Sequence, residues 1–144
     1  NYIYGTWSVL SALNLVEFEE KKIVFEKAIS YLKKNQKKDG GWGEDGRTYD
    51  KKFIGHEVIS TPSQTSWAIM GLLCAGEVKS DSVKRGINYL TTLGKWEEEM
   101  FTAVGFPKVF YLKYHGYSKY FPLLALSKYR NLIKSNSQKP IYGA

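Results

Sequence analysis

The chain has 144 residues, of which 43% are hydrophobic, and this is enough for one domain or for a piece of a larger one. Its net charge of +7 favours an anionic partner, either nucleic acid or a membrane surface, but Lys and Arg are spread along the chain, so we interpret most of them as solvated helix faces. The single cysteine, Cys74, excludes an internal disulfide, and the longest apolar run, residues 67–76, is too short to span a bilayer.

Two helices and a loop are predicted in the first third of the chain. Thr6 suits the N-cap of a helix over residues 6–15, because apolar residues follow it at helical spacing. A second helix with one apolar face is predicted over residues 19–35. The glycine-rich stretch 38–46 is predicted to be a loop and not a strand.

The third helix has the clearest start signal. Thr61 is predicted at its N-cap, Pro62 at its first position and Gln64 at its third, which together form a capping box. The residues that follow are apolar nearly all round, which indicates a buried helix that includes Cys74. Gly76 is predicted to end this helix in the left-handed conformation.

Two more helices and a tail are predicted in the second half. One helix is expected from residue 80 or 81 to residue 92, with Gly94 closing it. Another is expected over residues 118–134, with Pro122 in its first turn, because proline deeper inside would break it. Residues 135–144 are interpreted as a polar tail that frays.

The run from Gly105 to Tyr117 gathers five aromatic residues and contains no carboxylate, no cysteine and one histidine, His115. Such a surface cannot abstract a proton or hold a metal, but it presents π faces to an apolar or a cationic partner. Aromatic residues also fill ordinary cores, and composition alone favours that second interpretation. The five residues are Phe106, Phe110, Tyr111, Tyr114 and Tyr117.

Other chemistry-bearing residues give weaker signals. Glu44 and Asp45 could form a glycosidase dyad, but adjacent side chains usually point apart and no second acidic site stands out. Residues 97–99, all glutamate, are interpreted as a solvated turn. Cys74, His56 and His115 are not at zinc-ligand spacing.

An internal repeat links the two halves. The pattern Tyr31-Leu32, Gln36, Gly41-Trp42 is echoed by Tyr89-Leu90, Gly94-Lys95-Trp96, each copy following an amphipathic helix. Helix-pair repeats need stacked neighbours, typically about three or more units. This sequence holds about two and opens at Asn1, without a methionine and directly on an aromatic segment, so we expect a fragment of a larger α–α toroid.

Five segments resemble the triterpene cyclases, and four of them, at residues 4–7, 41–45, 62–68 and 105–107, follow one another in the same order as in that family. Residues 36–42, Gln-Lys-Lys-Asp-Gly-Gly-Trp, match the family's glutamine–tryptophan (QW) repeat, and residues 4–7, 41–45 and 62–68 match further family segments. The Gly-Phe-Pro run at 105–107, followed by Phe-Tyr-Leu at 110–112 and two tyrosines, resembles the bacterial squalene–hopene cyclases and not the oxidosqualene branch. The resemblance covers residues 2 to about 129.

This resemblance implies an all-α fold, in which residues 1–134 are the C-terminal part of an α–α barrel domain built from helix-pair repeats with QW-type loops. It implies cyclisation of squalene to hopene or hopanol, started by an aspartate of an Asp-x-Asp-Asp motif that this sequence lacks, so the fragment alone is expected to be inactive. It further implies no cofactor, metal or nucleic acid. The expected partners are squalene and a membrane surface, with a homodimer left open, and the expected location is the cytoplasmic side of a bacterial membrane, peripheral or monotopic.

The resemblance also implies roles for individual residues. Phe106 and Phe110 are expected to face the later carbocations, and Tyr4 to lie near the catalytic acid. Further cavity-shaping residues near the first rings are Leu112, Tyr114 and Tyr117. Residues expected to stiffen the fold without touching substrate are Gln36, Gly41, Trp42 and Trp96. The second repeat departs from the family pattern, with Leu93 near the usual glutamine position and a shortened Gly-Lys-Trp loop.

Two alternatives remain at this point. One is a non-catalytic helical-repeat scaffold that binds a lipid or a protein, which an upstream Asp-x-Asp-Asp motif would argue against. The other is the related-fold prenyltransferase β-subunit, which needs zinc ligands that this sequence does not show.

Overall fold

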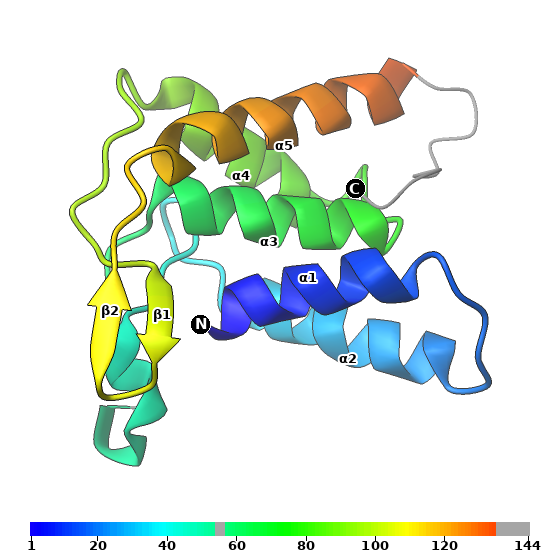
Figure 1. Ribbon diagram of the computed structural model, residues 1–144. Helices are drawn as coiled ribbons and strands as arrows, with labels where there is room; N and C mark the ends of the chain where they lie inside the picture. The colour runs from blue at the N-terminus through cyan, green and yellow to red at the C-terminus, as the bar shows by residue number, and fades with distance from the viewer. Residues whose placement is uncertain (54–56, 135–144) are drawn as a thin grey trace.

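The computed structural model describes residues 1–53 and 57–134 (Figure 1). His56 and the predicted tail at 135–144 lie outside the described residues, so the expectations for them stay predictions. The helices and strands, in chain order, are α1 (Tyr2–Leu13), α2 (Lys21–Lys34), α3 (Pro62–Cys74), α4 (Asp81–Thr92), β1 (Ala103–Phe106), β2 (Phe110–Leu112) and α5 (Tyr117–Lys134). Two short 3₁₀ turns, Gly46–Tyr49 and Lys51–Phe53, follow the glycine-rich loop. The predicted helical class is confirmed, but the short β1–β2 hairpin inside the aromatic run was not predicted.

Helix α3 is the centre of the molecule. All thirteen of its residues are buried, and it packs against α1, α2, α4 and α5 (Figure 1). Its apolar sequence explains this position, because a helix without a polar face has to be covered on every side. The other four helices present one buried face each to α3, and α1 and α5 leave apolar side chains such as Val9, Leu123 and Ile133 exposed on their outer faces.

Both predicted ends of α3 are confirmed. The Thr61 hydroxyl accepts a hydrogen bond from the amide of Gln64 at 3.3 Å. At the other end, Gly76 has a φ of 82°, and the amide of Glu77 reaches the carbonyl of Leu72 at 3.0 Å, which is a Schellman motif. The capping box is only half formed, because the Thr61 amide donates to the Trp42 carbonyl at 2.9 Å instead of to the Gln64 side chain.

The predicted start of α1 was wrong, whereas α4 and α5 have their predicted bounds to within one residue and differ only in the placement of Gly94 and Pro122. Helix α1 begins at Tyr2, and Thr6 lies inside it, where its hydroxyl donates to the Tyr2 carbonyl at 2.7 Å. Pro122 lies in the second turn of α5 and not the first, because the helix already begins at Tyr117. The cost is limited, since proline there removes one early intrahelical hydrogen bond and keeps a helical φ. Helix α4 ends through the extended backbone of Leu93, with Gly94 beyond it.

Candidate functional site

The first repeat loop, which is the glycine-rich stretch 38–46, is held in place by a fully buried tryptophan. The Trp42 side chain is 0% exposed, and its indole Nε1 donates to the carbonyl of Leu32 at 2.7 Å. Leu32 lies in the last turn of α2, where helix carbonyls have no intrahelical partner. The Trp42 amide donates to the Thr65 hydroxyl at 3.0 Å, which joins the loop to α3. Trp42 therefore gives a hydrogen-bond donor to a carbonyl at the C-terminal end of α2 and links that end to the central helix α3.

Gln36 links the same loop to helix α4. Its Nε2 donates to the carbonyls of Gly40 at 2.8 Å and Ser82 at 2.9 Å, and its Oε1 accepts from the Arg85 guanidinium. Gly40 has a φ of 89°, and a Cβ there would lie 2.6 Å from the Arg85 carbonyl oxygen. At Gly41 a Cβ would lie 2.6 Å from the Cβ of Ser60. The close packing of this loop explains its two adjacent glycines.

The second repeat keeps the indole contact despite its shorter loop. The Trp96 Nε1 donates to the carbonyl of Leu90 at 2.8 Å, in the last turn of α4. Trp96 is half-buried, whereas Trp42 is fully buried. In both repeats the tryptophan thus donates to the carbonyl of the leucine in the Tyr-Leu pair. This matches the internal repeat predicted from the sequence. The side-chain glutamine contact has no counterpart at Leu93, which has no polar side chain.

The hairpin carries Phe106 and Phe110 at its outer end. Its antiparallel strands pair Ala103 with Leu112 and Phe106 with Phe110, with an irregularity before Phe106. The two phenyl rings lie 5.5 Å apart, edge to face, and are 63% and 42% exposed. A Cβ on Gly105 would lie 2.0 Å from the Phe110 ring, so only glycine allows that ring to cover this strand. Leu112, at the end of β2, is also exposed.

Tyr111 attaches the hairpin to the first repeat loop. Its hydroxyl accepts from the Lys108 amide at 3.0 Å and donates to the carbonyl of Gly46 at 3.2 Å. A Cβ on Gly46 would lie 2.4 Å from the Tyr111 ring, so the ring lies directly against the loop backbone. The Asn1 side chain adds a 2.6 Å hydrogen bond to the carbonyl of Thr102, just before β1.

The predicted tyrosines belong to a second aromatic group, centred on Trp67 of α3. Tyr4 and Tyr117 approach the Trp67 ring edge-on, with centroids 5.1 and 5.7 Å away, and Tyr114 stacks on Tyr117 at 4.9 Å. The structure therefore brings Tyr4, Tyr114 and Tyr117 together. Phe106 and Phe110 contact each other and make no ring contact with this group among the described residues.

Trp67 itself and two rings that contact it directly were missed as site residues. Trp7 stacks parallel to Trp67 at 6.4 Å, and Phe121 meets Trp67 edge-on at 5.3 Å. Trp67 is 0% exposed, and its indole N–H has no hydrogen-bond partner among the residues that the structure describes. Trp7 and Trp67 both lie in segments that the sequence singled out for the family match, and this was the available signal.

The acidic residues do not form a catalytic pair. The buried Glu44 carboxylate accepts from the Ile3 amide at 2.7 Å, while Asp45 caps the Gly46–Tyr49 turn and binds Arg47. Burial raises the pKa of Glu44, partly offset by hydrogen bonds from backbone amides. The two carboxylates thus serve different partners, as expected for adjacent side chains.

The interpretation of residues 97–99 as a solvated turn was wrong for Glu98. Glu98 is half-buried and accepts two hydrogen bonds from Ser63, and burial raises its pKa. Within the described ranges, no group of three His, Cys, Asp or Glu side chains is placed to hold a metal ion. Over the same ranges, none of the helices has the length and hydropathy needed to cross a bilayer.

Comparison with known proteins identifies relatives over the whole chain. The family model described as "Squalene-hopene cyclase C-terminal domain" matches residues 1–131. The chain is 53% identical to a probable squalene–hopene cyclase of Sinorhizobium fredii, over 94% of this chain and 22% of that protein. It is 49% identical to the squalene–hopene cyclase of Zymomonas mobilis, over 99% of this chain and 22% of that protein. It is also 38% identical to the dammaradiene synthase of Dryopteris crassirhizoma, over 97% of this chain and 23% of that protein.

Proposed function

This chain belongs to the squalene-hopene cyclase C-terminal domain family, and on that premise we propose that it is part of a terpene cyclase that converts squalene to a hopanoid. The chain spans about a fifth of the length of the curated relatives that it matches. The reaction is a proton-initiated polycyclisation through carbocations. Because this sequence has no Asp-x-Asp-Asp motif, the initiating acid would come from another part of the complete protein.

The observation that carries this proposal is the exposed, edge-to-face pair Phe106 and Phe110 on a hairpin without carboxylates. A carbocation is quenched by water or by any lone pair within reach, so its stabiliser has to be polarisable and chemically inert. An aromatic face meets both needs and contributes roughly 0.5–2 kcal/mol, more where water is excluded. The two rings would stabilise the cations that form late in the cyclisation.

The second aromatic group would shape the cavity around the first rings. Tyr114 and Tyr117 stack on each other, and Tyr117 and Tyr4 both contact the buried Trp67 edge-on, so the three rings share one support in the core. A rigid wall holds a flexible polyene in a folded conformation, and orientation of this kind can supply a large part of a rate enhancement. Tyr4 would lie near the initiating acid, and Leu112 would extend the wall.

The proposal includes partners and a location. The complete enzyme would draw squalene from a bilayer as a peripheral or monotopic protein on the cytoplasmic side of a bacterial membrane, with basic residues facing anionic lipid. It would work as a monomer or a homodimer, without cofactor, metal or nucleic acid. The scaffold alternative is not favoured, since the relatives that match the whole chain are named as cyclases and a synthase.

The direct test incubates the complete, detergent-solubilised protein with squalene and analyses the lipid products by mass spectrometry. Pentacyclic products support the proposal, and their absence refutes it, provided that a Zymomonas mobilis relative processed in parallel is active. A chimera that carries residues 1–131 of this chain in that relative gives a second measurement. Retained cyclisation in the chimera would show that this segment supplies a competent wall.

A further inference from the structure

Glu98 joins the segment before the hairpin to the central helix. It lies in the connector of residues 93–102, between α4 and β1. Its carboxylate accepts hydrogen bonds from the Ser63 amide at 3.1 Å and from the Ser63 hydroxyl at 2.9 Å. Ser63 is the second residue of α3 and is fully buried. The connector is therefore bonded to α3, the helix that is buried along its whole length.

The position at the start of α3 suits a carboxylate. Amides in the first turn of a helix lack intrahelical acceptors, and the helix dipole places partial positive charge there. Thr61 already serves the Gln64 amide, so Glu98 takes a different amide of the same turn. The bond to Ser63 is thus additional to the N-cap and comes from a remote part of the chain.

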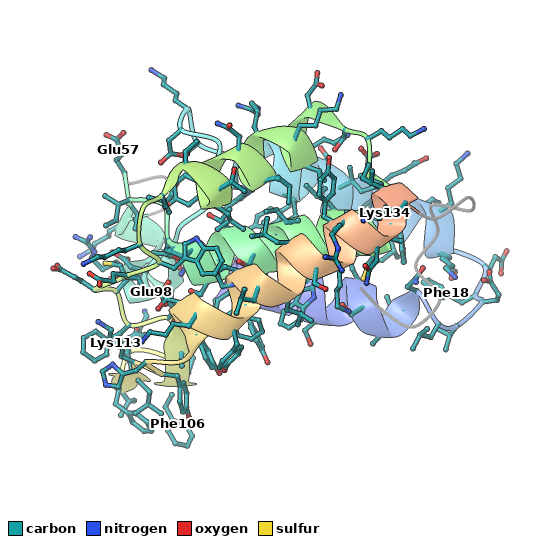
Figure 2. The ribbon with its side chains drawn as sticks, turned by 90° about the horizontal axis from the view of Figure 1, so that it is seen from above. Phe18, Glu57, Glu98, Phe106, Lys113 and Lys134 are labelled. Atoms are coloured by element: carbon teal, nitrogen blue, oxygen red, sulfur yellow. The ribbon has the colours of Figure 1, made fainter. Side chains whose placement is uncertain are left out.

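Glu98 also lies beside the far end of the hairpin. Lys113, directly after β2, is close enough for its charge to favour the ionised form of Glu98, against the burial that raises its pKa. Both residues line a cavity of about 530 Å³ together with Tyr114 and Ser118. Figure 2 shows Glu98 and Lys113 at the same end of the bundle, with Phe106 beyond them. The chain entering β1 and the chain leaving β2 therefore meet near one carboxylate.

We propose that Glu98 is a positioning residue, which fixes the base of the aromatic hairpin against the start of α3 and so sets where Phe106 and Phe110 meet the forming cation. This inference rests on the proposed cyclase function. Glu98 itself touches no substrate in this role. Without Glu98 the hairpin can shift relative to the helices. If Phe106 or Phe110 moves away from a late carbocation, that cation loses a proton to water before the last ring has closed.

The test compares four variants of the complete cyclase by the ratio of partly cyclised to fully cyclised products. Glu98→Ala is expected to raise this ratio about 3- to 10-fold, from the loss of two hydrogen bonds. Glu98→Gln keeps one acceptor oxygen and is expected to raise it less. Glu97→Ala removes an exposed carboxylate next to Glu98, and Thr61→Ala removes a cap from the same helix, and both are expected to leave the ratio unchanged.

The controls separate positioning from helix stability. If Glu98→Ala lowers the melting temperature but leaves the product ratio at the wild-type value, Glu98 only stabilises α3 and the inference is wrong. An equal rise in Thr61→Ala, at a matched loss of melting temperature, would also overturn it. A wild-type protein that makes no polycycle contradicts the proposed function instead, so the two failures are distinguishable.

Hydrogen exchange provides a measurement that does not depend on catalysis. In Glu98→Gln, amides of residues 103–112 are expected to exchange several-fold faster, while amides of α3 beyond Ser63 keep their wild-type protection. Uniform loosening of α3 and the hairpin would argue against a specific link. Unchanged exchange in the hairpin would show that Glu98 does not hold it.

Discussion

The indole N–H of Trp42 donates to the carbonyl of Leu32, ten residues earlier, at 2.7 Å. The same relationship recurs between Trp96 and Leu90 at 2.8 Å, across a loop four residues shorter in its Trp–Leu spacing. In both copies of the repeat, the tryptophan therefore caps the C-terminal end of a helix. Its ring then fills the space between that helix and its neighbours, which for Trp42 includes Gly86 of α4.

Trp42→Phe tests this role. It keeps an aromatic ring but leaves the buried Leu32 carbonyl without its partner, so we expect a loss of about 1–3 kcal/mol in the free energy of unfolding. Trp96→Phe is the matched control, and we expect a smaller loss because Trp96 is only half-buried, so that water can replace the indole N–H at the Leu90 carbonyl in the variant. Denaturant unfolding of the complete protein measures both. Equal losses would mean that ring volume, and not the hydrogen bond, determines the effect.

Phe106→Ala tests the cation-stabilising role. At roughly 0.5–2 kcal/mol for one cation–π contact, we expect early-terminated products to increase about 2- to 30-fold relative to the pentacyclic product. Val109→Ala is a suitable control, because Val109 is 74% exposed in the turn of the same hairpin. Product analysis with squalene provides the measurement. The same product at the same rate from Phe106→Ala would remove Phe106 from the mechanism.

Tyr111→Phe tests the attachment of the hairpin to the first repeat loop. The variant loses the hydroxyl that joins the Lys108 amide to the Gly46 carbonyl. At about 0.5–1.5 kcal/mol for each net hydrogen bond, the loss of both bonds amounts to about 1–3 kcal/mol, so we expect amide exchange in residues 106–110 to speed up about 5- to 160-fold. Tyr89→Phe also removes one hydroxyl contact, to the Ser60 carbonyl, but away from the hairpin. Equal exchange in the two variants would contradict this prediction.

Glu44→Gln tests the effect of burial on a carboxyl group. Burial raises the folded-state pKa of Glu44 above its ordinary value of 4.5, so the folded state binds this proton more tightly than the unfolded state does. Its contribution to stability is complete below about pH 4.5 and declines as the pH rises through the window between the two pKa values. We expect Glu44→Gln, which keeps the acceptor for the Ile3 amide, to lose less stability between pH 4.5 and 7. Parallel melting curves against pH would refute this.

The sequence predicted α3 best because its ends carry specific chemistry. Thr61, Pro62 and Gly76 each restrict the backbone in a way that is local and readable without tertiary contacts. The start of α1 was missed because Asn1 makes no side-chain cap, and its side chain bonds to Thr102 instead. Such a contact, between residues far apart in the chain, leaves no local signal.

The site was predictable in its residues and not in their grouping. The aromatic run and Tyr4 could be singled out, but strands of three and four residues are too short for alternation to be read, so the hairpin was not predicted. The hairpin separates Phe106 and Phe110 from the tyrosines, which join Trp67 through α5 and α1. The partial burial of Glu98 was not predicted because three consecutive glutamates are usually solvated. Glu98 differs from Glu97 and Glu99 only through its contact with Ser63, which is distant in the chain.

The two indole–carbonyl bonds also have a consequence for synthesis on the ribosome. Each closes within a short stretch of chain, so α2 and α4 can both receive their caps soon after the corresponding tryptophan has emerged. Of the five described helices, α5 is synthesised after the other four, and it packs on an α3 that they already partly cover. A nascent chain stalled before residue 117 would therefore expose the face of α3 that carries Trp67. A chaperone that binds apolar surfaces would bind the chain at this face.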